Sequence, residues 1–316
     1  MNKPILYLTC GMPGSGKSTW LENHKEELDF IIHSSDFIRS ELGDINDQSQ
    51  NELVFNTLHK RVKEDLLNGK NVAYDATSLN RRKRLSFLRE IQDIPCEKIC
   101  VLFATPIEIC KVNNANRERK VPEEVIDRMI RNFEVPCVQE GWNKVQIVWW
   151  DWQSEGMKFD FHEDVEKWRS ISHDNPHHSN SIGDHMIKAW EYSWKNSDSC
   201  SDSLLLDLSA YMHDCGKIKT KEFINSKGEP CDSAHYYEHH NVSAYESLFY
   251  LKDLFTEDAK LNDEEILYVS LLINMHMRPF LAYKDSDKSR ERDRRLFGDN
   301  FMKDLDFLHM CDLAAH

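Results

Sequence analysis

Two sets of residues in this sequence of 316 residues have the types and the spacing to act on phosphate groups. The first is the glycine-rich stretch GMPGSGKST at residues 11–19, which has the spacing of a phosphate-binding loop. The second is a set of histidines and aspartates in the C-terminal half, where His213 and Asp214 are adjacent. The loop predicts binding of a nucleoside triphosphate, and the second set suggests a divalent metal.

The loop has the sequence context that this chemistry needs. The apolar run ILYLTC before it predicts a buried strand, and a helix is expected from Lys17 to about Leu28. Backbone N–H groups and the start of the helix would surround the phosphates. Lys17 would neutralise the β- and γ-phosphates, and Ser18 would hold Mg²⁺. The predicted nucleotide-binding residues are Gly11, Gly14, Ser15, Gly16, Lys17, Ser18 and Thr19.

The segment HSSDFIRSEL contains candidates for the acceptor side of the reaction. Asp36 lies just past a predicted strand end, where ligands bind in open α/β sheets. Arg39 is three residues further on, so the two side chains share a pocket if a helix begins there. An aspartate can accept a hydroxyl proton, and an arginine can bind a phosphate through two hydrogen bonds. The alternative is a helix-capping aspartate with a solvent-exposed arginine.

Three stretches, GMPGSGKSTW, SSDFIRSEL and YDATSLNRRKR, resemble the kinase domain of the phage 5′-polynucleotide kinase family over roughly residues 4–150. The resemblance implies that Asp36 is the general base on a 5′-hydroxyl and that Arg39 contacts the 3′-phosphate of the terminal nucleotide. The stretch NRERKVP resembles the lid of this family. It implies that Arg117 or Arg119 stabilises the transferring phosphoryl group, and the choice between them stays open.

Two further features of the first half have competing interpretations. Asp75 lies at a predicted strand end, where it either orders the Mg²⁺ shell or is an ordinary loop residue. The basic run RRKR at residues 81–84 is expected to be a solvated helix face rather than a nucleic-acid contact.

The C-terminal half carries 12 of the 15 histidines. His213 and Asp214 end a predicted apolar helix, so both side chains can reach one metal. Imidazole and carboxylate ligands suit Mn²⁺, Fe²⁺, Co²⁺ or Ni²⁺. Two such metals would activate a water and bind the oxygens of a phosphoester. Further candidates follow in order on separate predicted helices: His185, His240, His276 and Asp312.

This pattern resembles the HD phosphohydrolase superfamily over roughly residues 170–316. The resemblance implies that four residues bind a first metal, that Asp214 bridges to a second, and that two histidines complete the second site. The first-metal residues are His185, His213, Asp214 and Asp312, and the added pair is His240 and His276.

Three further positions in this half each have two interpretations. His240 is preferred over His239 because HNVSAYE resembles the ligand-bearing helix of that superfamily. Lys217 either steadies a phosphate or is a solvated loop residue. His178 either contacts substrate or is structural.

The elements that must position these residues change character along the chain. In the first half, strands are expected at ILYLTC, FIIHSS, NVAYDA, KICVLFA and KVQIVWW. Helices are expected between them at residues 17–28, 47–68, 81–91, 107–116 and 122–132. This alternation predicts an α/β domain with a mostly parallel sheet, at residues 1–155. Residues 156–316 are expected to form an all-α helical bundle, with helices at 182–195, 204–214, 241–251, 263–275 and 299–315.

The composition of the chain limits the binding partners and the cellular compartment that are expected. The net charge of −14 argues against indiscriminate coating of nucleic acid. Nine cysteines without a CxxC pair, no signal peptide and no long apolar run predict a soluble cytoplasmic protein without a membrane partner.

Together these features predict an enzyme that heals broken nucleic-acid ends, most simply RNA ends. The first domain would phosphorylate a 5′-hydroxyl using ATP or another NTP with Mg²⁺. The second would remove a 2′,3′-cyclic or terminal 2′- or 3′-phosphate with one or two transition metals. A separate RNA ligase is the expected partner. The alternative is a bifunctional kinase and phosphohydrolase that acts on small nucleotides or other metabolites.

Overall fold

A computed structural model describes residues 3–43, 49–176, 179–197, 202–254 and 260–316. The chain divides into two compact units. The first consists of Met1–Met129 and Pro136–Trp152, and the second of Ile130–Val135 and Gln153–His316. The predicted boundary near residue 155 thus differs from the observed one by a few residues, and a short segment of the N-terminal half packs within the second unit.

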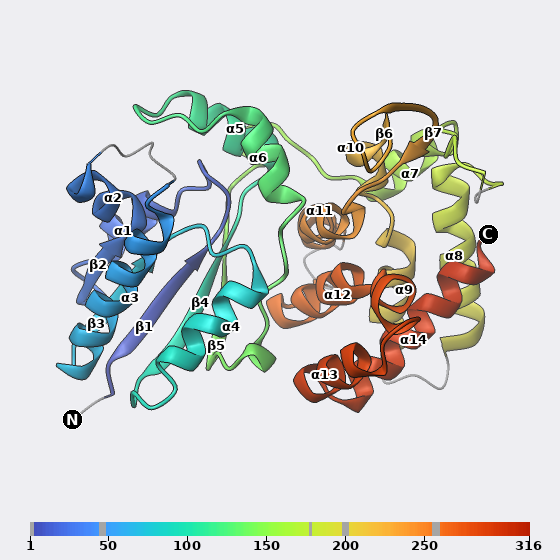
Figure 1. The fold of residues 1–316 in the computed structure, drawn as a ribbon. Helices are drawn as coiled ribbons and strands as arrows, with labels where there is room; N and C mark the ends of the chain where they lie inside the picture. Colours follow the sequence, from blue (N-terminus) through green and yellow to red (C-terminus); the bar gives the residue numbers. More distant parts are fainter. Residues whose placement is uncertain (1–2, 44–48, 177–178, 198–201, 255–259) are drawn as a thin grey trace. The chain divides into compact units, whose positions relative to one another are not determined.

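The first unit is built on a five-stranded parallel sheet with the strand order β2-β3-β1-β4-β5 (Figure 1). Its strands are β1 (Ile5–Cys10), β2 (Phe30–Ser34), β3 (Asn71–Asp75), β4 (Glu97–Ala104) and β5 (Lys144–Trp149). Most residues of β1, β3 and β4 are buried, as expected for a parallel sheet that is covered on both faces. The parallel α/β architecture predicted for the first half is confirmed.

Helices connect these strands in alternation. They are α1 (Lys17–His24), α2 (Ser35–Leu42), α3 (Asn51–Leu67), α4 (Arg81–Glu90), α5 (Ile107–Ala115) and α6 (Glu123–Ile130), with a short 3₁₀ turn at Val138–Glu140. In a parallel sheet the carboxyl ends of all strands lie at one edge. The phosphate loop follows β1, Asp36 follows β2, and Asp75 ends β3, so the topology brings these three parts of the chain to one edge of the sheet.

The second unit is mainly helical (Figure 1). Its helices are α7 (Phe161–Trp168), α8 (Ile182–Asn196), α9 (Ser203–Met212), α10 (Lys217–Thr220), α11 (His239–Asp253), α12 (Asp263–Met275), α13 (Asp287–Phe297) and α14 (Asp299–Ala314), with a π-helical turn at Pro279–Tyr283. The core of this unit is formed mainly by α8, α9, α11, α12 and α14, which pack on one another.

The prediction of an all-α second half was wrong in one segment. Residues Glu222–Ile224 (β6) and Pro230–His235 (β7) form an antiparallel hairpin. Gly228 turns the chain with a φ of 80°, and the turn is closed by the Asn225 N–H, which donates to the Glu229 carbonyl at 2.8 Å. The hairpin is short and largely exposed, and its apolar residues Phe223 and Ile224 are adjacent rather than alternating, so it lacks the pattern that identifies a strand in sequence.

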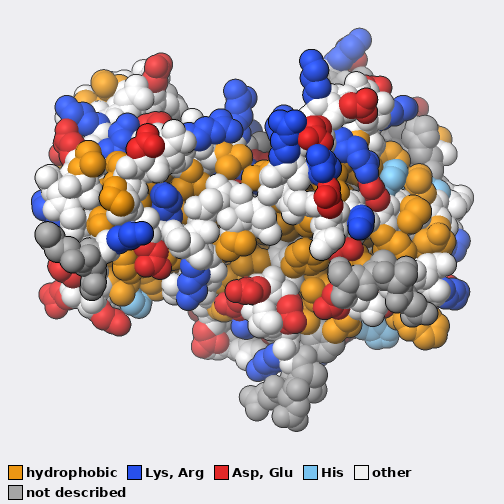
Figure 2. Space-filling model, turned by 90° about the horizontal axis from the view of Figure 1, so that it is seen from below, with side chains coloured by type: hydrophobic (Ala, Val, Ile, Leu, Met, Phe, Trp, Pro, Cys, Tyr) orange, Lys and Arg blue, Asp and Glu red, His pale blue; other side chains and the backbone are white. Residues whose placement is uncertain are grey.

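Charged side chains of both signs are interspersed on each unit in the face drawn in Figure 2. Many form local ion pairs, such as those of Glu291 with Arg294 at 2.7 Å and with Arg295 at 2.8 Å on α13. Solvent screens exposed pairs of this kind, so they do little to hold the fold. Among the described residues, no helix is long and apolar enough to cross a membrane.

Candidate active sites

The phosphate loop is formed by a backbone that only glycine can follow at two positions. Gly14 and Gly16 have φ values of 80° and 86°, in the left-handed region that glycine favours. A Cβ on Gly14 would also lie 2.2 Å from the Cys110 carbonyl oxygen. The next residue, Lys17, is buried, and its Nζ donates to the carbonyls of Gly11 at 3.0 Å and Met12 at 2.6 Å.

The loop is held from outside by side chains of later segments. Asn113 on α5 donates from Nδ2 to the Gly14 carbonyl at 3.0 Å, and the Thr105 hydroxyl donates to the Ser15 carbonyl at 3.1 Å. Thr19, which was predicted to bind nucleotide, is exposed on the first turn of α1. By contrast, Gly14 and Ser15 are held by hydrogen bonds from side chains that lie outside the loop motif.

Lys17, Ser18 and Asp75 form a compact polar group at the end of β3. The Ser18 hydroxyl donates to Asp75 Oδ2 at 3.3 Å. Burial raises the pKa of Asp75, and the nearby Asp36 carboxylate raises it further, while Lys17 opposes the shift. Burial also lowers the pKa of Lys17. A hydroxyl and a carboxylate at this position are ligands that suit Mg²⁺, so the group fits the predicted nucleotide–metal site.

Asp36 and Arg39 both lie on α2, as the helical spacing predicted. Asp36 is in the first turn and forms an ion pair with Arg119 of the lid segment. Arg39 is buried and donates from Nη2 to Asn51 Oδ1 at 2.7 Å. Arg117 is close enough to Lys17 that its charge contributes to lowering the lysine pKa. Arg117 and Arg119 therefore lie near different parts of the site, Lys17 and Asp36 respectively, and the choice between them stays open.

The basic run at residues 81–84 is not a fully solvated face, contrary to the prediction. Arg81 and Arg84 are buried, whereas the two residues between them are exposed. Arg84 binds Glu140 through two contacts, Nε to Oε2 at 2.8 Å and Nη2 to Oε1 at 2.6 Å. Arg84 Nη1 also donates to the Ser78 and Leu79 carbonyls, which fixes the loop that follows β3. Two of the four residues in this run, Arg81 and Arg84, are therefore buried residues that help to hold the fold.

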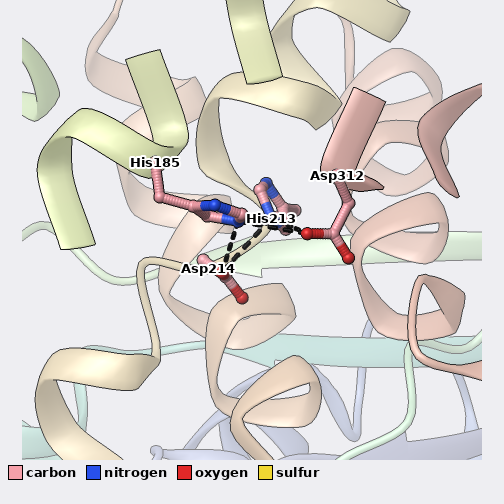
Figure 3. Close-up of side chains that lie close together, drawn as sticks. All are labelled: His185, His213, Asp214 and Asp312. Atoms are coloured by element: carbon pink, nitrogen blue, oxygen red, sulfur yellow. Dashed lines mark hydrogen bonds and ion pairs between the residues drawn. The ribbon is translucent and has the colours of Figure 1, made fainter. Parts of the chain in front are cut away.

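In the second unit, four predicted metal-site residues converge from three helical segments (Figure 3). His185 comes from α8, His213 and Asp214 follow α9, and Asp312 comes from α14. His185 Nε2 lies 3.2 Å from Asp214 Oδ2, 3.1 Å from Asp312 Oδ1 and 3.2 Å from His213 Nε2. All four side chains are buried.

A second group shares Asp214 with the first. Its other oxygen, Oδ1, lies 3.1 Å from His239 Nε2 and 3.7 Å from His276 Nε2. The structure thus places His239, rather than the predicted His240, in this group. His240 is the next residue on α11, so its side chain points elsewhere, and its Nε2 lies 3.5 Å from Glu238 Oε2. Burial lowers the pKa of His240 to about 3, so this ring is neutral.

The donor chemistry of these histidines fits a metal. Backbone carbonyls only accept hydrogen bonds, so a ring nitrogen that contacts one carries the proton. Four Nδ1 atoms make such contacts: His185 with Ala315 at 3.4 Å, His213 with Ala210 at 2.8 Å, His239 with Tyr236 at 2.9 Å and His276 with Ile273 at 2.7 Å. In the neutral rings the Nε2 atoms then carry lone pairs, which face the two carboxylates. These Nε2 atoms also face one another, at 3.2 Å between His185 and His213 and at 3.3 Å between His239 and His276. A bound cation would accept these lone pairs and would remove the repulsion between the converging acceptor atoms.

The pKa shifts at this site show that the buried carboxylates are stabilised by nearby positive charge. Burial by itself would raise the pKa of Asp214, but the charges of His213 and Lys217 outweigh it and hold that pKa well below its usual range. Burial likewise opposes a charge on His213, yet Asp214 and Asp312 raise its pKa to about 10, so without a metal this ring holds a proton that a bound cation would replace. The two carboxylates therefore favour any cation that can lie between the rings.

Lys217 is buried rather than solvated. Its Nζ lies 2.7 Å from Asp214 Oδ2 and 5.5 Å from the centre of the Tyr236 ring. It is therefore placed beside the residue that the two groups share. His178 lies outside the described residues.

Three residues that the sequence analysis did not select lie at this site. His239 was considered and not chosen, while His173 and His316 were given no role. The His173 ring packs edge to face against His185 with centroids 5.6 Å apart, and His316 Nε2 lies 3.5 Å from Asp312 Oδ1. His316 is four residues after Asp312, so helical spacing could have indicated it, whereas His173 lies in a segment without regular structure that carries no such signal.

Known proteins resemble part of the chain. Residues 6–136 match the family model of the AAA domain. The L-seryl-tRNA(Sec) kinase of Methanococcus maripaludis is 25% identical over 149 residues, which are 46% of this chain and 58% of that protein. The chain therefore spans little more than half of that relative's length.

Solved structures with partial likeness include a chain of the Pnkp1/Rnl/Hen1 RNA repair complex, with a TM-score of 0.38, 20% identity and coverage of 41% of this chain and 43% of that one. They also include a gluconokinase from Sinorhizobium meliloti, with a TM-score of 0.35, 14% identity and coverage of 47% and 84%. The sheet topology, the loop and the family match together lead to one conclusion: the first unit is a P-loop kinase-like α/β domain, and a helical region follows it.

Proposed function

We propose that this protein heals broken RNA ends with two active sites on one chain. The observation that carries the proposal is the presence of two separate groups with complementary chemistry. One is a phosphate loop with Asp36 nearby, and the other is a buried set of histidines and carboxylates centred on Asp214. The first group suits the addition of a phosphate, and the second suits its removal.

In the kinase reaction, the oxygen of a 5′-hydroxyl attacks the γ-phosphorus of the NTP. Asp36 accepts the hydroxyl proton, the bond from the γ-phosphorus to the bridging oxygen breaks, and the nucleoside diphosphate leaves. Lys17 neutralises phosphate charge, and Ser18 and Asp75 would hold Mg²⁺. The pairing of Asp36 with Arg119 supports a role for this arginine near the reacting groups. Arg39, buried on the same helix, is proposed to contact a 3′-phosphate on the acceptor.

In the second reaction, one metal would be held by His185, His213, Asp214 and Asp312. A second would be held by Asp214, His239 and His276, with His239 replacing His240 in this assignment. Mn²⁺, Fe²⁺, Co²⁺ or Ni²⁺ fits these ligands, and such an ion supplies a Lewis acid and a nucleophilic water at neutral pH. Lys217 balances the charge of Asp214 and is proposed to orient a phosphate; its 2.7 Å contact with Asp214 Oδ2 supports a position beside both metals.

The two reactions are useful together when they act on opposite ends of a break. Many nucleases leave a 5′-hydroxyl and a 2′,3′-cyclic phosphate, whereas ligation needs a 5′-phosphate and a 3′-end free of phosphate. A kinase and a phosphohydrolase on one chain convert the first pair of ends into the second. An RNA ligase is then the partner that completes repair.

The second candidate is a bifunctional kinase and phosphohydrolase that acts on small nucleotides or other metabolites. The relative from Methanococcus maripaludis is named as an L-seryl-tRNA(Sec) kinase, so a seryl-tRNA is included as a further acceptor to compare. The discriminating measurement compares a 3′-phosphorylated dinucleotide, a free nucleoside and a seryl-tRNA as phosphate acceptors. RNA end healing predicts that the dinucleotide is preferred.

The proposal is tested with an oligonucleotide that carries a 5′-hydroxyl and a 2′,3′-cyclic phosphate. It is incubated with ATP, Mg²⁺ and either Mn²⁺ or Ni²⁺, and both ends are analysed by mass spectrometry. The expected products have gained a 5′-phosphate and lost the terminal 2′,3′-phosphate. No change at either end would refute the proposal.

A further inference from the structure

A segment from the N-terminal half of the sequence is built into the helical unit. Residues Ile130–Val135, here called the strap, begin at the last residue of α6 but belong to the second unit. Beyond Ile130, which ends α6, the strap contains no helix or strand. Its placement must therefore come from side chains of other elements that satisfy its backbone.

Two asparagines satisfy the buried backbone of the strap. Asn241 Nδ2 donates to the Arg131 carbonyl at 2.7 Å, and Asn274 Nδ2 donates to the Phe133 carbonyl at 3.2 Å. In the opposite direction, the Val135 N–H donates to Asn274 Oδ1 at 3.3 Å. Both asparagine side chains are buried, so losing one would leave backbone groups of the strap without these partners in an environment that excludes water.

Side chains of the strap add packing and charge to these hydrogen bonds. The Phe133 ring is fully buried and packs edge to face against Tyr245 of α11, with centroids 5.0 Å apart. Arg131 Nη1 lies 3.0 Å from Glu222 Oε1 at the start of β6. The strap is therefore a fixed part of this unit.

The two asparagines are next to the second group of candidate metal ligands. Asn241 follows His239 by two residues in the first turn of α11, and Asn274 precedes His276 by two residues at the end of α12. Asn274 Nδ2 also donates to Asn241 Oδ1 at 2.8 Å, which ties the two helix ends together. The Nε2 atoms of the two histidines are 3.3 Å apart. The asparagine pair therefore links the strap to the two helix ends that carry these rings.

We infer that the strap, through Asn241 and Asn274, positions His239 and His276 for the second metal. This inference rests on the proposed metal-dependent phosphohydrolase site and deepens it. It assigns two positioning residues, neither of which contacts substrate. It also means that the second activity needs residues of the N-terminal half, because a fragment that begins at Gln153 lacks the strap.

The test compares Asn274→Ala with a matched control, Ser270→Ala, in the full chain. Ser270 is also a buried residue of α12, and its hydroxyl lies 3.0 Å from the Ser247 hydroxyl of α11. Both substitutions remove a hydrogen bond between α11 and α12, but only Asn274→Ala also removes the hydrogen bonds to Phe133 and Val135 of the strap. Metal-free protein is titrated with Mn²⁺ alone and followed by electron paramagnetic resonance.

Wild-type protein is expected to bind two ions. Asn274→Ala should weaken one of them about 10- to 100-fold, as is typical when a residue that orients a ligand is lost, and leave the other unchanged. Hydrogen exchange of the strap amides should accelerate in Asn274→Ala and not in Ser270→Ala. The retained first ion shows that the unit is folded.

The inference is overturned if Asn274→Ala keeps both affinities, or if Ser270→Ala weakens the same ion by the same factor. If Asn274→Ala loses both ions, a second variant, Phe133→Leu, is used instead. It weakens the packing of the strap against Tyr245 by a change within the strap itself. That variant should then weaken only the second ion, and unchanged binding would overturn the inference. Wild-type protein that binds no Mn²⁺ would refute the proposed phosphohydrolase as well, so the two failures are distinguishable.

Discussion

Replacing Glu140 by glutamine is expected to destabilise the first unit strongly. The side chains of Glu140 and Arg84 are fully buried, and the carboxylate accepts hydrogen bonds from Arg84, Arg81 and the Trp142 indole. Glutamine has nearly the same shape but no charge. The substitution therefore leaves the Arg84 guanidinium without its counter-charge in the interior.

Breaking a buried ion pair from one side costs about 3–5 kcal/mol. For a domain of this size, each kcal/mol lowers the melting temperature by about 2–4 °C, so a decrease of roughly 6–20 °C is expected. The same network holds the Ser78 and Leu79 carbonyls, and the neighbouring Thr77 carbonyl accepts from the Gly11 N–H at 3.0 Å. Nucleotide affinity should therefore fall together with stability.

The assay is thermal unfolding of the full chain with and without nucleotide. The transition that shifts upward with nucleotide belongs to the first unit. The matched control is Glu90→Gln, because Glu90 pairs with Lys63 at 3.0 Å on the surface of the same unit. An exposed pair contributes at most about 1 kcal/mol. The reasoning would be refuted if Glu140→Gln lowered the transition no more than Glu90→Gln.

Three further predictions concern the two sites. Arg119→Ala should lower the kcat of the kinase about 10³-fold or more if this lid arginine stabilises the transferring phosphoryl group; steady-state kinetics beside Arg117→Ala would show which arginine acts, and an unchanged kcat would exclude Arg119. Arg39→Ala should weaken a 3′-phosphorylated acceptor selectively, so KM for a 3′-phosphorylated dinucleotide should rise while KM for a free nucleoside stays constant; equal changes would argue against the phosphate contact. Burial, followed by the charge of Lys217, lowers the pKa of His173 to about 4. Because its ordinary value is near 6.5, the unfolded chain binds the proton first, and the second unit should lose stability as the pH falls from about 6.5 to 4. Urea unfolding of metal-free His173→Gln at the two ends of this range should show a smaller loss than the wild type, and an equal loss would contradict the assignment.

The parts of the fold that depend on local pattern could be predicted from the sequence. The phosphate loop needs a strand, a glycine-rich turn and a helix in immediate succession, and all three are written within about twenty residues. Asp36 and Arg39 are three residues apart, so a single helix turn places them on α2. The five strands carry enough apolar and β-branched residues to be recognised without knowledge of their partners.

The remaining features depend on contacts between distant segments. The predicted ligand, His240, and the observed one, His239, are one residue apart on α11, and one residue rotates a side chain by about 100° around a helix. Arg84 and Glu140 are 56 residues apart, so the run RRKR gave no sign that half of it is buried. The strap pairs with residues 110 and 139 positions away. Neither periodicity nor composition carries information about such contacts.

The central claim, two independent activities on opposite ends of a break, is tested most directly on a nicked RNA stem-loop. The nick carries a 5′-hydroxyl and a 2′,3′-cyclic phosphate, and end groups are analysed for wild type, Lys17→Ala and Asp214→Ala, together with the metal content of each protein. Wild type should heal both ends, Lys17→Ala only the 3′-end, and Asp214→Ala only the 5′-end with loss of bound metal. EDTA followed by Mg²⁺ alone should reproduce the Asp214→Ala result. Loss of both activities in either correctly folded variant, or an unchanged 3′-end in wild type, would contradict the account.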